Sequence, residues 1–444
     1  MHYKSLLIKP SLAAALSLAL FACSSDTTVE TLAAEVSEET SQTLSEDSEE
    51  AIIYFTVGTS TSSGVVYSKS VAQAREDTEI QTEYEKDIKS VHLYIFIEGD
   101  EEIEDDSDYY FLSSYHFDES SEATDEQSAL TTLNENVGTK QCWIKLSIPA
   151  DMVNKQVKFA IIANDQPDEP TVGETSLADF KVVLATASVS SGDPADNLVG
   201  GEIYSSSTTG YPMSAVAVDE DEAEEITLDG IDISLSANLQ RTMARLDIFN
   251  FTPNLTITDV KMYNVIDKSY LFSQGDEVTA NPDESSFISL EALTYFTDSS
   301  QGNEYILPFT FVDPADDESN TSIAFTEEDY RELNTLEGIF YMYEQYVDSK
   351  HVPYVVIEYE YDYGTGDDDA VVSGSVKVEF KDTSDNYVNI ERNNRYRIRF
   401  GDGSGLDGII RCGFEIDDWY YYNTDSTTEI DISVDISEDN STEE

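Results

Sequence analysis

Short segments in which apolar and polar residues alternate recur along the chain, and they restrict its fold more than any other feature. Within residues 354–361, Val355, Ile357 and Tyr359 fall on one side, and Glu358 and Glu360 fall on the other. A repeat of two is that of a β-strand with one buried face and one wetted face. The pattern therefore predicts a strand at the surface of a sheet.

The next segments extend this pattern. Two glycines in the polar stretch 362–369 are followed by Val376 and Val378 alternating with Lys377 and Glu379, which predicts a β-hairpin. Further strands are expected at 51–57, 91–97 and 157–163, where both faces are largely apolar, and at 395–400. In the last of these, arginines alternate with apolar residues, so Arg395, Arg397 and Arg399, with nearby Arg392, are expected to point outward and pair with carboxylates.

Helical spacing is limited to 176–187 and to a short turn that begins at Thr326. Many short strands separated by polar turns favour a sandwich over parallel α/β units. The fold class predicted from these patterns is all-β with minor helices.

The N-terminus predicts export. Lys4 and Lys9 precede an apolar stretch at 11–21, and small Ala22 stands directly before Cys23. This is the pattern of a bacterial lipoprotein signal with a lipidated Cys23; an ordinary secretory signal with an incidental cysteine is the alternative. Residues 1–22 are then the signal peptide, and the Ser-, Thr- and Glu-rich segment 23–50 is expected to be a disordered acidic linker.

Charge and motifs exclude several classes of function. The formal net charge is -66, from 90 acidic and 24 basic residues, which argues against nucleic acid as a partner. Acidic clusters such as 100–106 lack the spacing of a calcium loop, and the four histidines form no zinc-protease motif. No catalytic residue, metal site or cofactor is therefore predicted, although carboxylate pairs leave catalysis open in so acidic a chain. If Cys23 carries lipid, Cys142 and Cys412 remain, and the sequence does not decide whether they pair.

Two further features concern processing and assembly. Arg75 is the only arginine before Arg241 and lies in a polar segment, so an arginine-specific protease has a single site in the first half; an ordinary surface arginine is the alternative. Near the C-terminus apolar residues take every second position: Ile430, Ile432, Val434 and Ile436. This strand could pair at the edge of its own sheet or with a neighbouring molecule.

Five separated segments together resemble the fimbrillin family of Bacteroidales, the subunits of type V pili. They are the strand at 91–97, the strand ending in Ala-Asn at 159–164, the Arg-containing segment 239–246, Tyr-Met-Tyr-Glu-Gln at 341–345, and Arg-Asn-Asn-Arg-Tyr at 392–396. Gln345 departs from the asparagine usual in the family. The order and spacing of the segments, over roughly residues 50 to 400, carry the resemblance.

The resemblance implies two transthyretin-like β-sandwich domains, at 51–235 and 236–423, and a C-terminal tail at 424–444. It implies an outer-membrane lipoprotein precursor that becomes part of a cell-surface fimbria supporting adhesion. A trypsin-like, arginine-specific protease would cut between Arg75 and Glu76, removing the lipid with the strand at 52–57, the segment 65–70, or both. The strand at 430–436 would then be donated to another fimbrial subunit.

Alternatives within the family are an anchor, which keeps its lipid and first strand, and a tip subunit. Outside it, the alternative is a surface-exposed glycan-binding β-sandwich lipoprotein, with Trp419 and Tyr420 to Tyr422 as candidate contacts.

Overall fold

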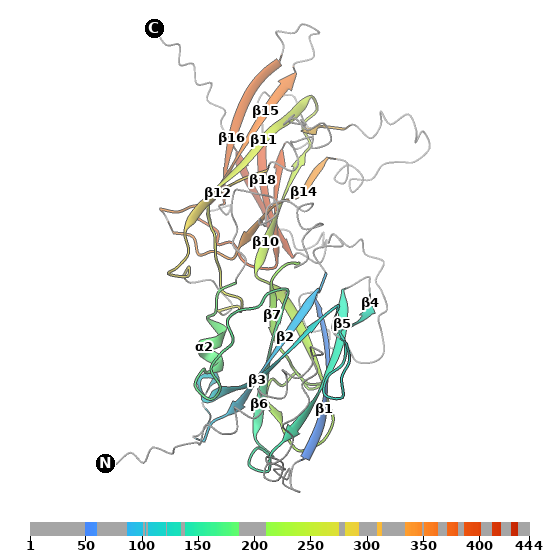
Figure 1. The fold of residues 1–444 in the computed structure, drawn as a ribbon. Coiled ribbons are helices and arrows are strands. Elements are labelled where there is room, and N and C mark those ends of the chain that lie inside the picture. The colour runs from blue at the N-terminus through green and yellow to red at the C-terminus, as the bar shows by residue number, and fades with distance from the viewer. Residues whose placement is uncertain are drawn as a thin grey trace, which may run out of the picture. The chain divides into compact units, whose positions relative to one another are not determined.

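Nineteen strands dominate the computed structural model of the chain, which is shown in Figure 1. The structure describes residues 49–59, 87–100, 103, 105–120, 122–134, 138–185, 210–274, 280–292, 309–312, 334–348, 350–362, 371–380, 386–400, 411–418 and 428–433. Cys23, Arg75, Glu76, Val434 and Ile436 lie outside these ranges, as do Thr326 and the aromatic run 419–422. Nothing in the described residues contradicts the all-β prediction, which is confirmed.

The first sheet contains nine described strands, which lie between residues 49 and 241. In spatial order eight of them are β3 (Tyr109–Asp118), β2 (Ser90–Glu98), β6 (Gln156–Ala163), β7 (Met213–Val216), β9 (Ile233–Arg241), β1 (Glu49–Thr59), β5 (Thr139–Ile148) and β4 (Thr131–Asn134). The ninth, β8 (Ile226–Thr227), pairs with β6.

The second and third sheets come from the second half. The second has the order β14 (Thr335–Tyr343), β10 (Met243–Asn250), β17 (Asn394–Phe400), β18 (Arg411–Asp418) and β19 (Thr428–Ser433). The third has the order β12 (Phe287–Glu291), β11 (Leu255–Ile266), β15 (Tyr354–Asp362) and β16 (Val371–Glu379), with β13 (Phe309–Thr310) paired to β11.

The alternation read from the sequence corresponds to burial in the hairpin of β15 and β16. Val355 and Ile357 of β15 and Val378 of β16 are fully buried, whereas Glu358 and Lys377 are exposed. The expected strands at 51–57, 91–97 and 157–163 are β1, β2 and β6. The periodic segments are therefore strands, as predicted.

The helix expected over 176–187 is only partly formed. After the 3-10 turn η1 (Asp106–Asp108), helix α2 covers Leu177–Lys181, and the side chain of Ser176 caps it by accepting from the Asp179 N–H. The helix ends because Leu184 instead forms an antiparallel bridge with Tyr270. No helix among the described residues is long and apolar enough to cross a membrane.

The prediction that the arginines of 392–399 point outward is wrong for three of them. Arg392, Arg395 and Arg397 are buried, and only Arg399 is partly exposed. Strand β17 lies in the interior of the second sheet, between β10 and β18, and side chains are buried on both of its faces. A period of two gives the faces of a strand, but it does not tell whether both faces are covered.

Strand β9 belongs to the first sheet and β10 to the second, and only Thr242 separates them. The boundary expected between residues 235 and 236 therefore falls inside β9. The division into two transthyretin-like domains remains a prediction.

Candidate functional site

Strand β1 lies in the interior of the first sheet, although it comes from the beginning of the described chain (Figure 1). It pairs antiparallel with β5, where Ile53 lies opposite Ile144, and parallel with β9, where Ile53 lies opposite Ile233. Its two neighbours are distant in sequence from β1 and from each other. The first strand is thus held by long-range pairing on both edges.

The side chains of β1 alternate between a fully buried and a partly buried face. Ala51, Ile53, Phe55 and Val57 are at most 1% exposed and belong to the apolar core of the first sheet. The ring of Phe55 packs edge-on against Phe159 of β6, with a centroid distance of 5.4 Å. This face of β1 is therefore buried in the core, as expected for a strand in the interior of a sheet.

Polar contacts fix the register of β1 near its start. The N–H of Ile52 donates to Oδ1 of Asp232 at 2.9 Å, and Glu50 pairs with Nζ of Lys145 at 2.6 Å. At the other end the backbone passes close to Thr139: a Cβ added to Gly58 would stand 3.3 Å from the Thr139 hydroxyl. Glycine therefore gives β1 its close approach to β5.

Removing β1 would expose one continuous apolar groove. Its walls would be the buried side chains of the two flanking strands: Cys142, Ile144, Leu146 and Ile148 of β5, and Leu235, Ala237 and Leu239 of β9. The backbone groups of β5 and β9 that now pair with β1 would lose their partners. Such a groove can bind one extended strand through backbone hydrogen bonds and alternate apolar side chains.

Cys142 faces this core as a free thiol. Burial raises the pKa of Cys142 to about 12, so the group is a neutral, unreactive thiol at physiological pH. It lies opposite Phe55 in the first sheet, whereas Cys412 lies on β18 of the second. The two cysteines do not form a disulfide in this structure.

The C-terminal strand pairs within its own sheet. Strand β19 lies at the edge of the second sheet and runs antiparallel to β18, with Ile430 opposite Phe414 and Ile432 opposite Cys412. The described part of the tail therefore takes the first of the two positions expected from the sequence, the edge of its own sheet.

Two polar residues of the segments that carried the family resemblance, Asn164 and Arg392, are buried hydrogen-bonding groups. Asn164, which has a positive φ of 59°, donates to the carbonyls of Asp87 and Tyr211 and accepts from the N–H of Lys89. Arg392 pairs with Glu344 at 2.8 Å. These residues position backbone segments, a role that local sequence patterns do not reveal.

A second buried group centres on Asp247 of β10, which pairs with Arg245 of the same strand and with Arg395 of β17. The N–H of Gly338 also donates to Asp247. Burial alone would raise the pKa of Asp247, but the two guanidinium groups and this hydrogen bond outweigh it and lower the pKa to about 2. The carboxylate is therefore ionised and structural.

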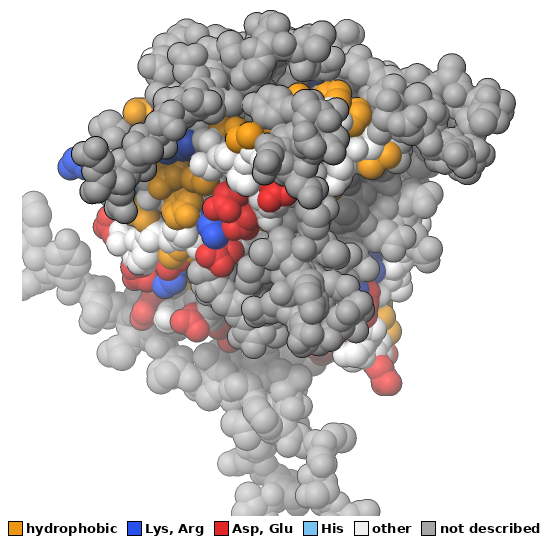
Figure 2. All heavy atoms as spheres, turned by 90° about the horizontal axis from the view of Figure 1, so that it is seen from above, with side chains coloured by type: hydrophobic (Ala, Val, Ile, Leu, Met, Phe, Trp, Pro, Cys, Tyr) orange, Lys and Arg blue, Asp and Glu red, His pale blue; other side chains and the backbone are white. Residues whose placement is uncertain are grey.

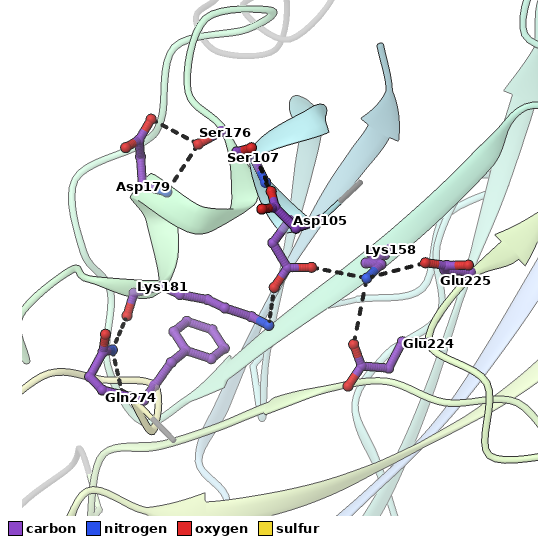
Figure 3. A network of polar contacts seen from close by, with 11 residues as sticks. Asp105, Ser107, Lys158, Ser176, Asp179, Lys181, Glu224, Glu225 and Gln274 are labelled. Carbon is purple, nitrogen blue, oxygen red and sulfur yellow. Dashed lines mark hydrogen bonds and ion pairs between the residues drawn. The ribbon is translucent and has the colours of Figure 1, made fainter. Parts of the chain in front are cut away.

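A polar network lies on the first sheet, and Figure 3 shows Lys158, Lys181, Glu224 and Glu225 in it. Asp106 accepts from Lys158 of β6 at 2.9 Å and from Lys181 of α2 at 2.6 Å. Glu224 and Glu225 lie within 3.8 Å of the Lys158 ammonium. Burial opposes ionisation of Asp106, but the two lysines lower its pKa below the usual value. Because Asp106 contacts both Lys158 of β6 and Lys181 of α2, the network fastens α2 to the sheet.

Side chains of different kinds meet on the one face of the molecule that Figure 2 draws. Figure 2 shows red acidic, blue basic and orange apolar side chains next to one another on the face seen from above. The described residues contain no cluster of three or more His, Cys, Asp or Glu side chains suited to hold a metal ion.

Comparison with known proteins gives similar solved structures only. Neither a protein-family model nor a curated protein matches the chain in sequence. A putative cell adhesion protein from Parabacteroides distasonis is similar with a TM-score of 0.41 and 16% identity, over 84% of this chain and 99% of that one.

Two fimbrial proteins of Porphyromonas gingivalis are also similar. The tip protein Mfa3 has a TM-score of 0.39 and 13% identity, over 83% of this chain and 100% of that one. The anchor protein Mfa2 has a TM-score of 0.35 and 12% identity, over 84% and 100%. Scores and identities this low do not decide the function of this chain.

Proposed function

We propose that this chain is a structural, non-enzymatic subunit of a cell-surface fimbria that polymerises by donor-strand exchange and supports adhesion. The observation that carries the proposal is the position of β1. Strand β1 occupies an interior position of the first sheet, and the segment that contains Arg75 follows it in the sequence, before the next described strand, β2. Cleavage between Arg75 and Glu76 would cut the covalent link between β1 and the rest of the sheet.

The free energy gained by burying the side chains of β1 is large enough to drive the exchange of strands. Burying Ile53, Phe55 and Val57 contributes about 5 to 9 kcal/mol before the entropy of ordering the strand is subtracted. A subunit that loses β1 loses this burial and exposes the backbone edges of β5 and β9. A second strand with apolar residues at alternate positions restores both.

The tail supplies a strand of this kind. Ile430, Ile432, Val434 and Ile436 repeat the spacing of the four buried residues of β1. In the proposed fimbria, the tail of one subunit leaves the edge of its own sheet and fills the β1 position of the next subunit.

The lipid on Cys23 would tether the precursor to the outer membrane until cleavage releases it. The proposed partners are therefore a trypsin-like protease, the membrane before maturation, and other fimbrial subunits afterwards. An anchor subunit would instead keep both its lipid and β1, and a tip subunit would lack a donated tail.

Intact-mass measurement of protein sheared from the cell surface tests the proposal. A stalk subunit is expected to begin at Glu76, and the variant Arg75→Ala should keep the precursor mass. Lys69→Ala, which removes a nearby basic residue, serves as the matched control and should still be cleaved. A diacylated Cys23 terminus on the wild-type protein in shed filaments would overturn the maturation scheme and favour the anchor.

A further inference from the structure

The single residue between β9 and β10 is buried and fully hydrogen-bonded through its backbone. The N–H and hydroxyl of Thr242 both donate to the carbonyl of Pro212, at 3.1 and 3.2 Å, and its carbonyl accepts from the N–H of Glu344 at 3.3 Å. Thr242 itself is 0% exposed. The junction is therefore built into the interior, unlike an exposed linker.

One continuous segment, 233–250, is paired into two sheets across this junction. Upstream of Thr242, β9 pairs with β1 and β7; downstream, β10 pairs with β14 and β17. The strand that borders the β1 position thus continues directly into an interior strand of the second sheet.

Arg392 fastens the segments around the junction. Its Nε and Nη2 donate to one carboxylate oxygen of Glu344 at 2.9 and 2.8 Å, while Nη1 and Nη2 donate to the carbonyls of Leu271 and Tyr270 at 2.8 and 2.9 Å. The same Leu271 carbonyl accepts from the hydroxyl of Ser214 in β7 at 2.6 Å. Arg392, which lies just before β17 of the second sheet, and Ser214 of the first sheet therefore both donate to the carbonyl of Leu271.

Apolar packing continues across the same region. The ring of Tyr211 lies 4.7 Å from that of Tyr341, and the ring of Phe180 lies 5.8 Å from that of Phe272. These residues belong to one buried core that includes side chains of α2, β2 and β3 as well as of β10, β11 and β14.

We propose that the Thr242 junction, with Arg392 as its positioning residue, couples the first sheet to the second and third so that the chain unfolds as one cooperative unit. Breaking the Arg392 contacts leaves a buried carboxylate and two carbonyls without their charged donor, which is costly in the interior. The structural coupling rests on these contacts alone. Only its biological use rests on the proposed function: in a fimbria, each subunit would transmit tension to the next.

Calorimetry of the unassembled full chain tests the coupling. The wild type is expected to show one heat-absorption peak whose calorimetric and van't Hoff enthalpies agree. The variant Arg392→Gln is expected to separate it into two peaks, and hydrogen exchange should then show β1 and β5 opening independently of β10 and β17. Lys377→Gln, an exposed control, should keep the single peak.

Two results would overturn the coupling: two peaks in the wild type, or a single peak with matching enthalpies in Arg392→Gln. If Arg392→Gln does not fold, Arg392→Lys replaces it in the test, because lysine keeps the charge but lacks the planar fork of donors. The same comparison of calorimetric and van't Hoff enthalpies then decides whether the coupling is lost. Because only monomers are measured, failure of donor-strand exchange would leave this result unaffected.

Discussion

At the scale of single residues, buried polar groups join segments of this fold that are far apart in the sequence. Asn164, Arg392 and Asp247 are each buried and satisfy backbone or charged partners from distant segments. Lone buried charges are rare in proteins because their desolvation is costly, so Asp247 depends on Arg245 and Arg395, and Arg392 depends on Glu344.

His92 gives the first sheet a pH dependence. Its ring lies 4.1 Å from that of His116 on the neighbouring strand, and Asp118 is 3.2 Å from His116. Burial, together with the proximity of His116, lowers the pKa of His92 from 6.5 to about 4, although Asp118 opposes the shift. The unfolded chain therefore binds the proton more readily, and stability is lost as pH falls from about 6.5 toward 4.

We expect this loss to reach about 2 kcal/mol, as measured by urea unfolding at pH 7 and pH 4.5. The variant His92→Phe should lose less stability than the wild type over this interval. His351→Gln, at a more exposed site, should behave as the wild type does. Equal acid sensitivity in His92→Phe and in the wild type would contradict the prediction.

At the scale of elements, β1 and β19 differ in how they are held. Strand β1 has partners on both edges, whereas β19 pairs only with β18 among the described strands. A strand with one paired edge is released at a lower cost in hydrogen bonds than a strand with two. The described part of the tail is thus the easier of the two strands to release, and the proposed scheme requires a cut at Arg75 before β1 can be lost.

The donor tail is tested by changing its apolar positions. Replacing Ile432 and Val434 with aspartate should leave monomers folded but abolish heat-resistant ladders on gels, because charged side chains cannot enter the apolar groove. The double variant Ser433→Asp, Ser437→Asp adds the same charge at the alternate positions of the strand and should still form ladders. Ladders that persist in the first variant would count against donor-strand polymerisation.

At the scale of the whole molecule, charge opposes assembly. The formal net charge of the full sequence is -66, and most of its acidic residues lie after Arg75, so subunits of the proposed fimbria would repel each other. About 0.1 M salt screens such charges beyond roughly 10 Å. Light scattering of processed subunits should therefore show faster polymerisation at 200 mM than at about 20 mM sodium chloride, with sucrose of equal osmolality as control. Polymerisation that slows as salt is added would contradict this prediction, because it would show that attraction between opposite charges dominates the contact between subunits.

Periodicity and composition, which are local properties, predicted the strands at 51–57, 91–97, 157–163, 354–361 and 395–400, the all-β class and the acidic charge. Contacts between distant segments, which periodicity does not reveal, pair Ile53 with both Ile144 and Ile233, bury Arg395 and Arg397, and continue β9 into β10 through Thr242. Alternation along a strand shows which side chains share a face. Whether that face is buried depends on neighbouring elements, which come from distant parts of the chain.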